Sequence, residues 1–135
     1  MASLNYSDDS SNHFLNTFTK NILDCDKSIR WIGITDHNGI IIKEGSRKGV
    51  KLLLTTEENS EFARNSITRH KARIKFESKM GKLLYAFRRY EYLSRCIIPI
   101  NEMYYLIFTM DLEEEDFHNI LIERIIPLIN NEENF

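Results

Sequence analysis

The order in which the hydrophobic pattern changes along the chain constrains its fold more than any other feature of the sequence. Near the start, apolar residues recur at spacings of three and four and form one stripe, which consists of Phe14, Leu15, Phe18, Ile22 and Leu23. This spacing predicts an amphipathic helix, for which Asn12 is the expected cap. Strand-like and helical segments then alternate, and the complete order is helix, two strands, helix, three strands, helix.

The first two strands are predicted to form a hairpin. Segments 31–35 and 40–42 are rich in β-branched residues and flank the sequence Asp36-His37-Asn38-Gly39. Asn and Gly both tolerate a positive φ, which a tight turn between antiparallel strands requires. The second strand is expected to end near Gly45.

The second helix is predicted from its N-terminal signal. Thr55 and Glu58 have the spacing of a capping box, in which each side chain accepts a hydrogen bond from the other residue's backbone N–H. A narrow stripe follows, formed by Phe62, Ala63, Ser66, Ile67 and His70. The helix is expected to reach Lys71 or beyond. Residues 73–81 fit either an extension of this helix or a crossing to the sheet, and the sequence leaves both open.

Three more strands are predicted at residues 83–89, 93–100 and 103–110, the last two joined by a two-residue turn at Asn101 and Glu102. Residues 74–90 contain enough Lys, Arg and Leu that a helix is the alternative for the first of these strands. The segment 103–110 is apolar on both faces, which predicts a central strand.

The final helix is expected to begin at Asp111 as cap, with Glu114 at capping-box spacing. Its core-facing residues are Phe117, Ile120, Leu121, Ile125, Leu128 and Ile129. Pro127 lacks a backbone donor and clashes with the preceding turn, so the helix should kink or stop there.

These elements predict an α+β fold with one five-stranded antiparallel sheet flanked by helices, the first and last helices on the same side. We expect residues 12–131 to form a single α+β domain and residues 1–11 to form a disordered acidic tail. No apolar run approaches the roughly 20 residues of a membrane span, so a cytoplasmic protein is expected. Its two cysteines, Cys25 and Cys96, are expected to be reduced structural thiols.

The charges are segregated along the chain. Between positions 64 and 95 there are ten basic residues, opposed by Glu77 and Glu91 alone, so this segment carries +8. The remainder carries −10, because the net charge of the chain is −2. If the fold keeps these regions apart, one face should attract an acidic partner.

Sequence patterns for catalysis and ligand binding are absent. The four histidines, His13, His37, His70 and His118, have no metal-ligand spacing. The five glycines are isolated, which excludes phosphate-binding fingerprints. We therefore expect no catalytic site, no metal and no cofactor, and a protein that is not an enzyme.

The order of elements resembles the roadblock (dynein light chain) family, and the expected fold is roadblock/profilin-like. A shorter run, from Gly81 to Pro99, is similar to a stretch of small uncharacterised archaeal proteins. The roadblock resemblance implies a non-enzymatic regulatory or scaffolding module that forms a homodimer through its second helix and the following strand. It also implies a platform beside small GTPases or motor complexes.

On this resemblance the dimer seam would use Phe62, Ile67, Tyr85 and Phe87, with Arg88, Arg89 and Arg95 at its rim. Two alternatives remain open. One is a PAS-like ligand-sensing domain with a cavity between helices and sheet. The other is nucleic-acid binding through the basic aromatic segment 64–95, where aromatic and cationic side chains alternate.

Overall fold

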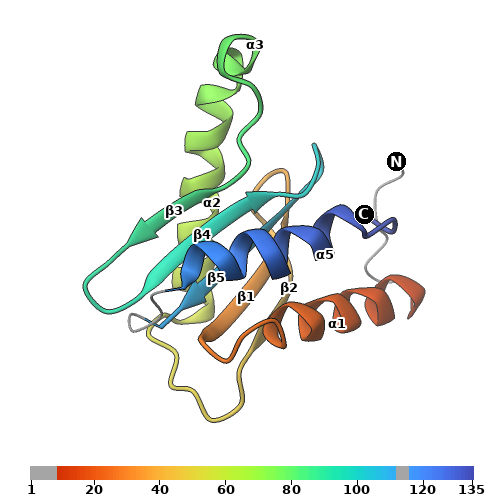
Figure 1. The fold of residues 1–135 in the computed structure, drawn as a ribbon, viewed down its shortest axis with the longest axis vertical. Helices are drawn as coiled ribbons and strands as arrows, with labels where there is room; N and C mark the ends of the chain where they lie inside the picture. Colours follow the sequence, from red (N-terminus) through yellow and green to blue (C-terminus); the bar gives the residue numbers. More distant parts are fainter. Residues whose placement is uncertain (1–8, 112–115) are drawn as a thin grey trace.

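Five antiparallel strands form one sheet, with helices on both faces (Figure 1). The computed structural model describes residues 9–111 and 116–135. The strands are β1 (Ile29–Asp36), β2 (Ile41–Ser46), β3 (Ala86–Arg89), β4 (Ser94–Pro99) and β5 (Tyr104–Met110). Their spatial order is β2-β1-β5-β4-β3, so β5 is central, and all of its residues are buried. The predicted five-stranded antiparallel sheet and its central last strand are confirmed.

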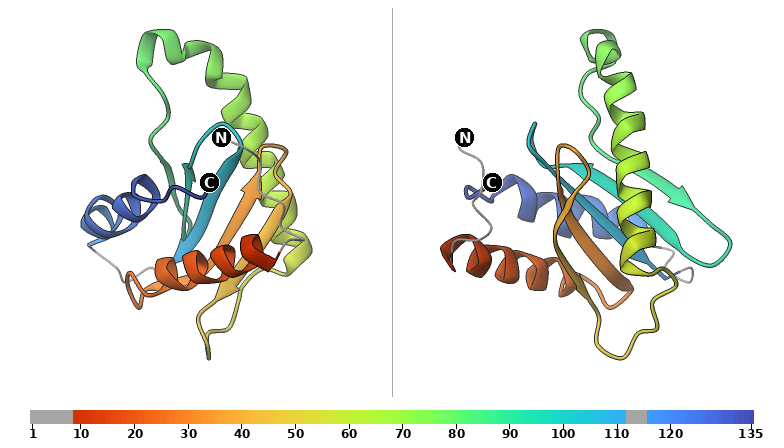
Figure 2. Two further views of the ribbon diagram at one scale, coloured as in Figure 1. Left: turned by 90° about the vertical axis from the view of Figure 1, so that its right-hand side faces the viewer. Right: turned by 180° about the vertical axis from the view of Figure 1, so that it is seen from behind.

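The first and last helices cover one face of the sheet, as predicted (Figure 2). They are α1 (Asp9–Leu23) and a C-terminal run of α4 (Phe117–Ile120), the π-helical turn η2 (Leu121–Ile125) and α5 (Ile126–Asn130). The opposite face carries α2 (Thr56–Arg73), which continues through the 3-10 turn η1 (Ile74–Phe76) into α3 (Glu77–Met80). The sheet therefore separates two apolar clusters, and the smaller one lies under α2.

One local signal was interpreted correctly from the sequence, and another in part. Thr55 caps α2 in a complete capping box with Glu58, with both backbone-to-side-chain hydrogen bonds present. The β1–β2 hairpin forms, but only Gly39 has a positive φ, of +84°. Asn38 keeps a negative φ because the turn is held by Asp36, whose Oδ1 accepts hydrogen bonds from the N–H groups of Asn38 and Ile40.

The ends of the chain differ from the sequence-based boundaries. Helix α1 begins at Asp9, so Asn12 lies inside the helix and does not cap it. Within the predicted tail, residues 9–11 are helical, and residues 1–8 lie outside the described part of the chain. Phe135, beyond the predicted domain boundary at 131, is 1% exposed and belongs to the larger apolar cluster.

The prediction that Asp111 caps the last helix is wrong. Its Oδ1 accepts a 2.5 Å hydrogen bond from Arg30 Nη1, and α4 begins only at Phe117. Glu114, the other half of the predicted capping box, lies outside the described residues. Pro127 does not stop the helix. The π-helical turn η2 ends at Ile125, and the helix continues through α5 to Asn130. Pro127 therefore lies in the first turn of α5, where the missing N–H is tolerated.

Strand β3 is shorter than predicted, because residues 83–85 do not pair with β4. Tyr90 N–H donates to Leu93 O. Because every second pair of an antiparallel ladder is hydrogen-bonded, the next hydrogen-bonded pairs toward the start of β3 are Arg88 with Arg95 and Ala86 with Ile97. The next hydrogen-bonded pair would need an N–H from Pro99, which has none. The ladder therefore ends at Ala86. The helical alternative for this segment is wrong, whereas residues 74–80 do extend the helical path.

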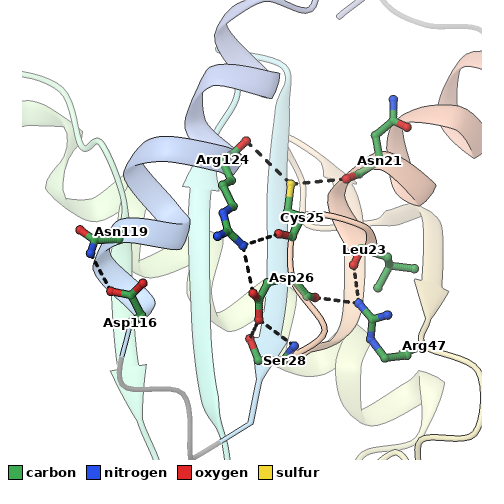
Figure 3. A network of polar contacts seen from close by, with 9 residues as sticks. All are labelled: Asn21, Leu23, Cys25, Asp26, Ser28, Arg47, Asp116, Asn119 and Arg124. Carbon is green, nitrogen blue, oxygen red and sulfur yellow. Dashed lines mark hydrogen bonds and ion pairs between the residues drawn. The ribbon is translucent and has the colours of Figure 1, made fainter.

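A network of polar contacts fixes the turn between α1 and β1 (Figure 3). Arg124 Nη1, from the last helix, donates to Cys25 O at 3.0 Å and to Asp26 Oδ1 at 3.1 Å. Arg47 donates to the carbonyls of Leu23, Asp26 and Ile29. Asp26 Oδ2 accepts from the N–H and hydroxyl of Ser28. This turn is thus tied to both the last helix and the end of β2.

We expect Asp26→Asn to remove a pH-dependent part of the stability. Burial acts to raise the pKa of the Asp26 carboxyl, but the Ser28 hydrogen bonds and the Arg124 charge together lower it below its ordinary value. A lowered folded-state pKa stabilises the fold above the unfolded value of about 3.9, and that contribution is lost as the pH falls through the folded-state pKa. The variant should lose about 1–2 kcal/mol near neutral pH and converge on the wild type in acid.

Urea unfolding of both proteins between about pH 7 and about pH 3 measures this difference. Asp24→Asn is the matched control, because Asp24 is the exposed neighbouring carboxylate. A gap between Asp26→Asn and the wild type that stays constant with pH would contradict the assigned role of the carboxylate.

Candidate interaction surface and pocket beside the second helix

Helix α2 packs on the sheet with its N-terminal part and projects beyond the sheet with its C-terminal end (Figure 1). Ala63 and Ile67 are the buried apolar residues of the helix and contact a cluster formed by Trp31, Ile97, Tyr105 and Ile107. Past the sheet, η1 and α3 reverse the chain, and residues 81–85 run back beside α2 to β3 (Figure 2). Gly81 permits this reversal with a φ of +83°.

A pocket of about 320 Å³ lies between α2, the returning segment 81–84 and strands β3 and β4. Its volume falls at the lower end of the range for small-molecule sites, roughly 300–1,000 Å³. Apolar side chains from the helix, the returning segment and the sheet line it: Phe62, Met80, Leu83, Leu84, Ala86, Ile97 and Ile107. The pocket exists because residues 83–85 leave the sheet, and the returning segment 81–84 forms its outer wall.

The charged side chains of this pocket are mostly basic. Its basic lining residues are Arg69, Arg73, Lys82, Arg88 and Arg95, and its one acidic lining residue is Glu77. Over residues 9–111 and 116–135, none of the five cations forms an ion pair. Segregation of the charges along the sequence is thus partly preserved in space.

Arg95 is a buried cation without an anionic partner in the described structure. It is 5% exposed, and its guanidinium lies 4.5 Å from the centre of the Phe62 ring and 5.3 Å from that of Trp31. Nη1 donates to Asn59 Oδ1 at 3.0 Å, whereas Nη2 is buried with no hydrogen-bond partner. Burial lowers the pKa of Arg95 to about 10. The side chain therefore stays charged at neutral pH, at a cost of about 3 kcal/mol relative to an unperturbed arginine.

Arg88 adds a second positive charge on the same face. In the β3–β4 ladder it lies directly opposite Arg95, and side chains at such positions are about 5 Å apart at Cβ. Like charges placed directly opposite one another destabilise a sheet. Among residues 9–111 and 116–135 no carboxylate forms an ion pair with either arginine, which makes this end of the pocket a favourable place for an anion.

His70 lines the pocket and is paired with Tyr105 behind it. His70 Nδ1 and the Tyr105 hydroxyl are 2.6 Å apart, and His70 Nε2 lies 3.9 Å from Glu77 Oε1. Burial lowers the pKa of His70, and Glu77 opposes that effect. Burial also raises the pKa of Tyr105. At neutral pH both side chains are therefore uncharged, and the pair contributes polarity without a charge.

The segment outside the pocket is unusually rich in exposed apolar side chains. Residues 74–92 carry seven of the eleven exposed large apolar side chains in the described chain: Ile74, Phe76, Met80, Leu84, Phe87, Tyr90 and Tyr92. Large exposed apolar patches beside polar residues are typical of interaction sites, and this segment holds most of the exposed large apolar side chains of the described residues. We call residues 74–92 the apolar–basic segment, because five Lys and Arg side chains are interspersed among these residues.

The structure places the predicted interaction residues on both sides of the sheet. Phe62 and Arg95 contact each other on the α2 side, where Arg88 lines the same pocket and Ile67 is buried in the chain's own core. Two others face the opposite side. Tyr85 packs against the larger cluster, and the Phe87 ring stacks on Phe117 with centroids 3.9 Å apart. Arg89 is exposed on the edge strand.

Three residues that shape the site were not assigned to it from the sequence. Trp31 and Asn59 contact Arg95 but come from β1 and the first turns of α2, far from it along the chain. Pro99 is the third, since its missing donor ends β3 and so opens the pocket. Only Pro99 carried a readable signal, namely that a proline cannot donate to a neighbouring strand.

The fold has clear relatives among solved structures. An MglB protein with a tetrameric arrangement aligns with a TM-score of 0.71 at 9% identity, covering 87% of this chain and 83% of that chain. MglB of Myxococcus xanthus aligns at 0.66 and 13% identity, covering 87% and 89%. A roadblock/LC7 domain from Streptomyces avermitilis aligns at 0.64 and 6% identity, covering 84% and 90%. The chain has a roadblock-like fold.

No family model and no curated protein matches the sequence of this chain. The similarity of residues 81–99 to small archaeal proteins stays a prediction. None of the helices in the described part of the chain has the length and apolarity that a bilayer crossing requires. Within that part, the His, Cys, Asp and Glu side chains form no group of three that could hold a metal ion.

Proposed function

We propose that this protein is a non-enzymatic regulatory or scaffolding module of roadblock type, a homodimer that presents a basic surface to an acidic protein partner in the cytoplasm. The observation that carries the proposal is the open edge of β3 beside the apolar–basic segment in a roadblock-like fold. The proposed partner class includes small GTPases, because the roadblock resemblance implies a platform beside them.

The geometry of β3 supports pairing with a second copy. Because Arg88 and Ala86 occupy hydrogen-bonded positions of the β3–β4 ladder, the backbone N–H and C=O groups of Phe87 and Arg89 point to the open edge. An edge with free backbone groups is a template for another strand. A two-fold axis through this edge would join two sheets into one continuous sheet.

The apolar and charged side chains have opposite effects on such a dimer. Burying several of the exposed apolar side chains would contribute roughly 1.5–3 kcal/mol each. The arginines of two copies would repel, but at physiological salt the screening length is about 8 Å, so exposed charges at the rim cost little. The dimer should therefore form, and tighten as salt rises.

We expect Arg89→Pro to abolish the dimer and leave the fold intact. Proline at position 89 removes one outward N–H and no donor of the β3–β4 ladder, and proline is accepted on an edge strand. Sedimentation of the wild type at low and high salt gives the reference dimer, and the variant should be a monomer under both conditions. Arg89→Ala is the matched control, since it removes the same charge and keeps the N–H.

A wild-type chain that is monomeric at both salt concentrations would exclude the seam. The same preparations measure the partner: small GTPases loaded with GDP or a GTP analogue should bind the wild type, weaken with added salt, and lose affinity when Arg88 and Arg89 are both replaced by Glu. If the affinity changed neither with added salt nor with the two replacements, the basic surface would not be the binding site for the partner.

The alternatives have less structural support. Nucleic-acid binding needs aromatic side chains gathered on one accessible face, but Tyr85 and Phe87 pack against the α1/α4 side and Tyr90 contacts the Phe62 ring edge-on at 5.9 Å. Tyr92 alone of these four is mostly exposed, at 74%. The PAS-like alternative, by contrast, finds a pocket between helix and sheet, although no cofactor is indicated by its residues.

A further inference from the structure

We infer that the pocket between α2 and β3 binds a small amphipathic anion, with a carboxylate or phosphate head between Arg88 and Arg95 and an apolar body along the sheet. This inference goes beyond the proposed interaction function, because it concerns a concave site within one protomer. The binding of this ligand does not require the dimer, so the two can be measured separately.

The head-group site is defined by unpaired positive charge. Arg88 and Arg95 occupy directly opposite positions of β3 and β4 on the same face of the sheet, and both line the pocket. Arg95 is 5% exposed and its Nη2 has no hydrogen-bond partner within the described part of the chain, so the buried fork offers an unused donor there. A planar guanidinium recognises carboxylate and phosphate through two parallel hydrogen bonds. An anion here would satisfy the free donor and relieve the repulsion between the two arginines.

The body site is defined by its apolar lining. Ala86 and Ile97 form a cross-strand pair on the pocket floor, Ile107 extends the floor across β5, and Leu83 forms the outer wall. A free inorganic anion would leave these surfaces unoccupied, whereas an acyl chain or a flat ring would cover them. The His70–Tyr105 pair on the α2 side of the pocket is uncharged, so it does not compete with the ligand's anionic head for the arginines.

The remaining cations explain how the ligand would be retained. Arg69, Arg73 and Lys82 also line the pocket, on the α2 and returning-segment walls. None of them is paired in the described ranges 9–111 and 116–135. They surround the site with positive potential, which concentrates anions and raises their association rate. Glu77, the acidic residue among the described lining residues, lies 3.9 Å from the uncharged His70, and its single charge is outnumbered by the five cations.

Sodium decanoate, kept below its micelle-forming concentration, is the probe. Trp31 is the chain's only tryptophan and its ring lies 5.3 Å from the Arg95 guanidinium, so its emission reports occupancy next to the head-group site. We expect saturable decanoate binding by calorimetry, accompanied by a change in Trp31 fluorescence. Decanol, which has the same chain without the charge, should bind at least about tenfold more weakly, and acetate should not bind measurably.

Two variants separate the parts of the site. Arg88→Glu should weaken decanoate at least about tenfold, and Ala86→Leu should block the body site while leaving the charges unchanged. Lys20→Glu is the matched control for charge, since Lys20 is exposed on α1 on the far face of the sheet. It should bind decanoate like the wild type.

Three results would overturn the inference: no decanoate binding, equal binding of decanol and decanoate, or undiminished binding by Arg88→Glu. Sedimentation of each sample, run alongside, distinguishes this outcome from failure of the proposed dimer. Arg89→Pro should lose the dimer and retain decanoate, whereas Ala86→Leu should retain the dimer and lose decanoate. If both variants lost both properties, the site would not be independent of the dimer and the inference as stated would fail.

Discussion

We expect Phe135→Ala to lower the free energy of unfolding by about 3–5 kcal/mol, the range for truncating a fully buried aromatic side chain. The Phe135 ring is 1% exposed and lies edge-on to Phe14 and Phe18, with centroids 4.9 Å apart in each case. Tyr104 of the central strand completes the contact at 5.7 Å. One side chain after the last helix therefore joins α1 to the sheet, and its loss would leave a cavity between them.

Urea unfolding measures the change, with the midpoint expected to fall and the slope to stay constant. Glu133→Ala is the matched control, because Glu133 is exposed two residues earlier, and its effect should stay within about 0.5 kcal/mol. An equally small effect for Phe135→Ala would show that the ring is not part of the core in solution.

The parts of the fold that were predicted correctly are those whose signals are local. Thr55 and Glu58 form their capping box from a four-residue sequence, and Asp36 and Gly39 together fix the turn of the first hairpin. The seven residues of β5 are apolar on both faces, which can be satisfied only at the centre of a sheet covered on both sides. In each case the sequence segment contains all the residues that determine its structure.

The sequence-based predictions were wrong where residues distant along the chain determine the local structure. Residues 83–85 alternate like a strand, but pairing ends because the partner position on β4 is Pro99, fourteen or more residues away along the chain. Asp111 has the sequence of a helix cap, yet Arg30 of β1 binds its carboxylate. Local propensity predicts structure poorly where a tertiary contact provides a polar side chain with a stronger partner than the local backbone does.

The candidate site was only partly predictable for the same reason. The +8 segment was visible in the sequence, and it does supply all five cations of the pocket. The stacking of Arg95 between Trp31 and Phe62 was not visible, because β1, α2 and β4 meet only in the folded sheet. The pocket itself follows from the shortened β3, so the segment that departs from the predicted strand is also the one that shapes the site.

The hydrogen-bonded pair of Arg95 and Asn59 should respond to two substitutions in opposite ways: one should lower the free energy of unfolding, and the second, added to the first, should restore it. Asn59 is 4% exposed and its Oδ1 accepts a hydrogen bond from the buried guanidinium. Asn59→Leu alone should lower the free energy of unfolding by about 3 kcal/mol, since it leaves a buried charge with no acceptor.

Adding Arg95→Met to Asn59→Leu should reverse that loss. Burial has already lowered the pKa of Arg95 to about 10, so the charge opposes folding in the absence of an anion. Replacing a buried polar pair by apolar side chains of similar volume typically changes the stability by between zero and about 4 kcal/mol in the favourable direction. We therefore expect the double variant to be at least as stable as the wild type by urea unfolding, with a large coupling energy between the two positions. A double variant less stable than Asn59→Leu would mean that Arg95 holds the strands together through its stacking on Trp31 and Phe62, and that its charge is a structural feature of the core.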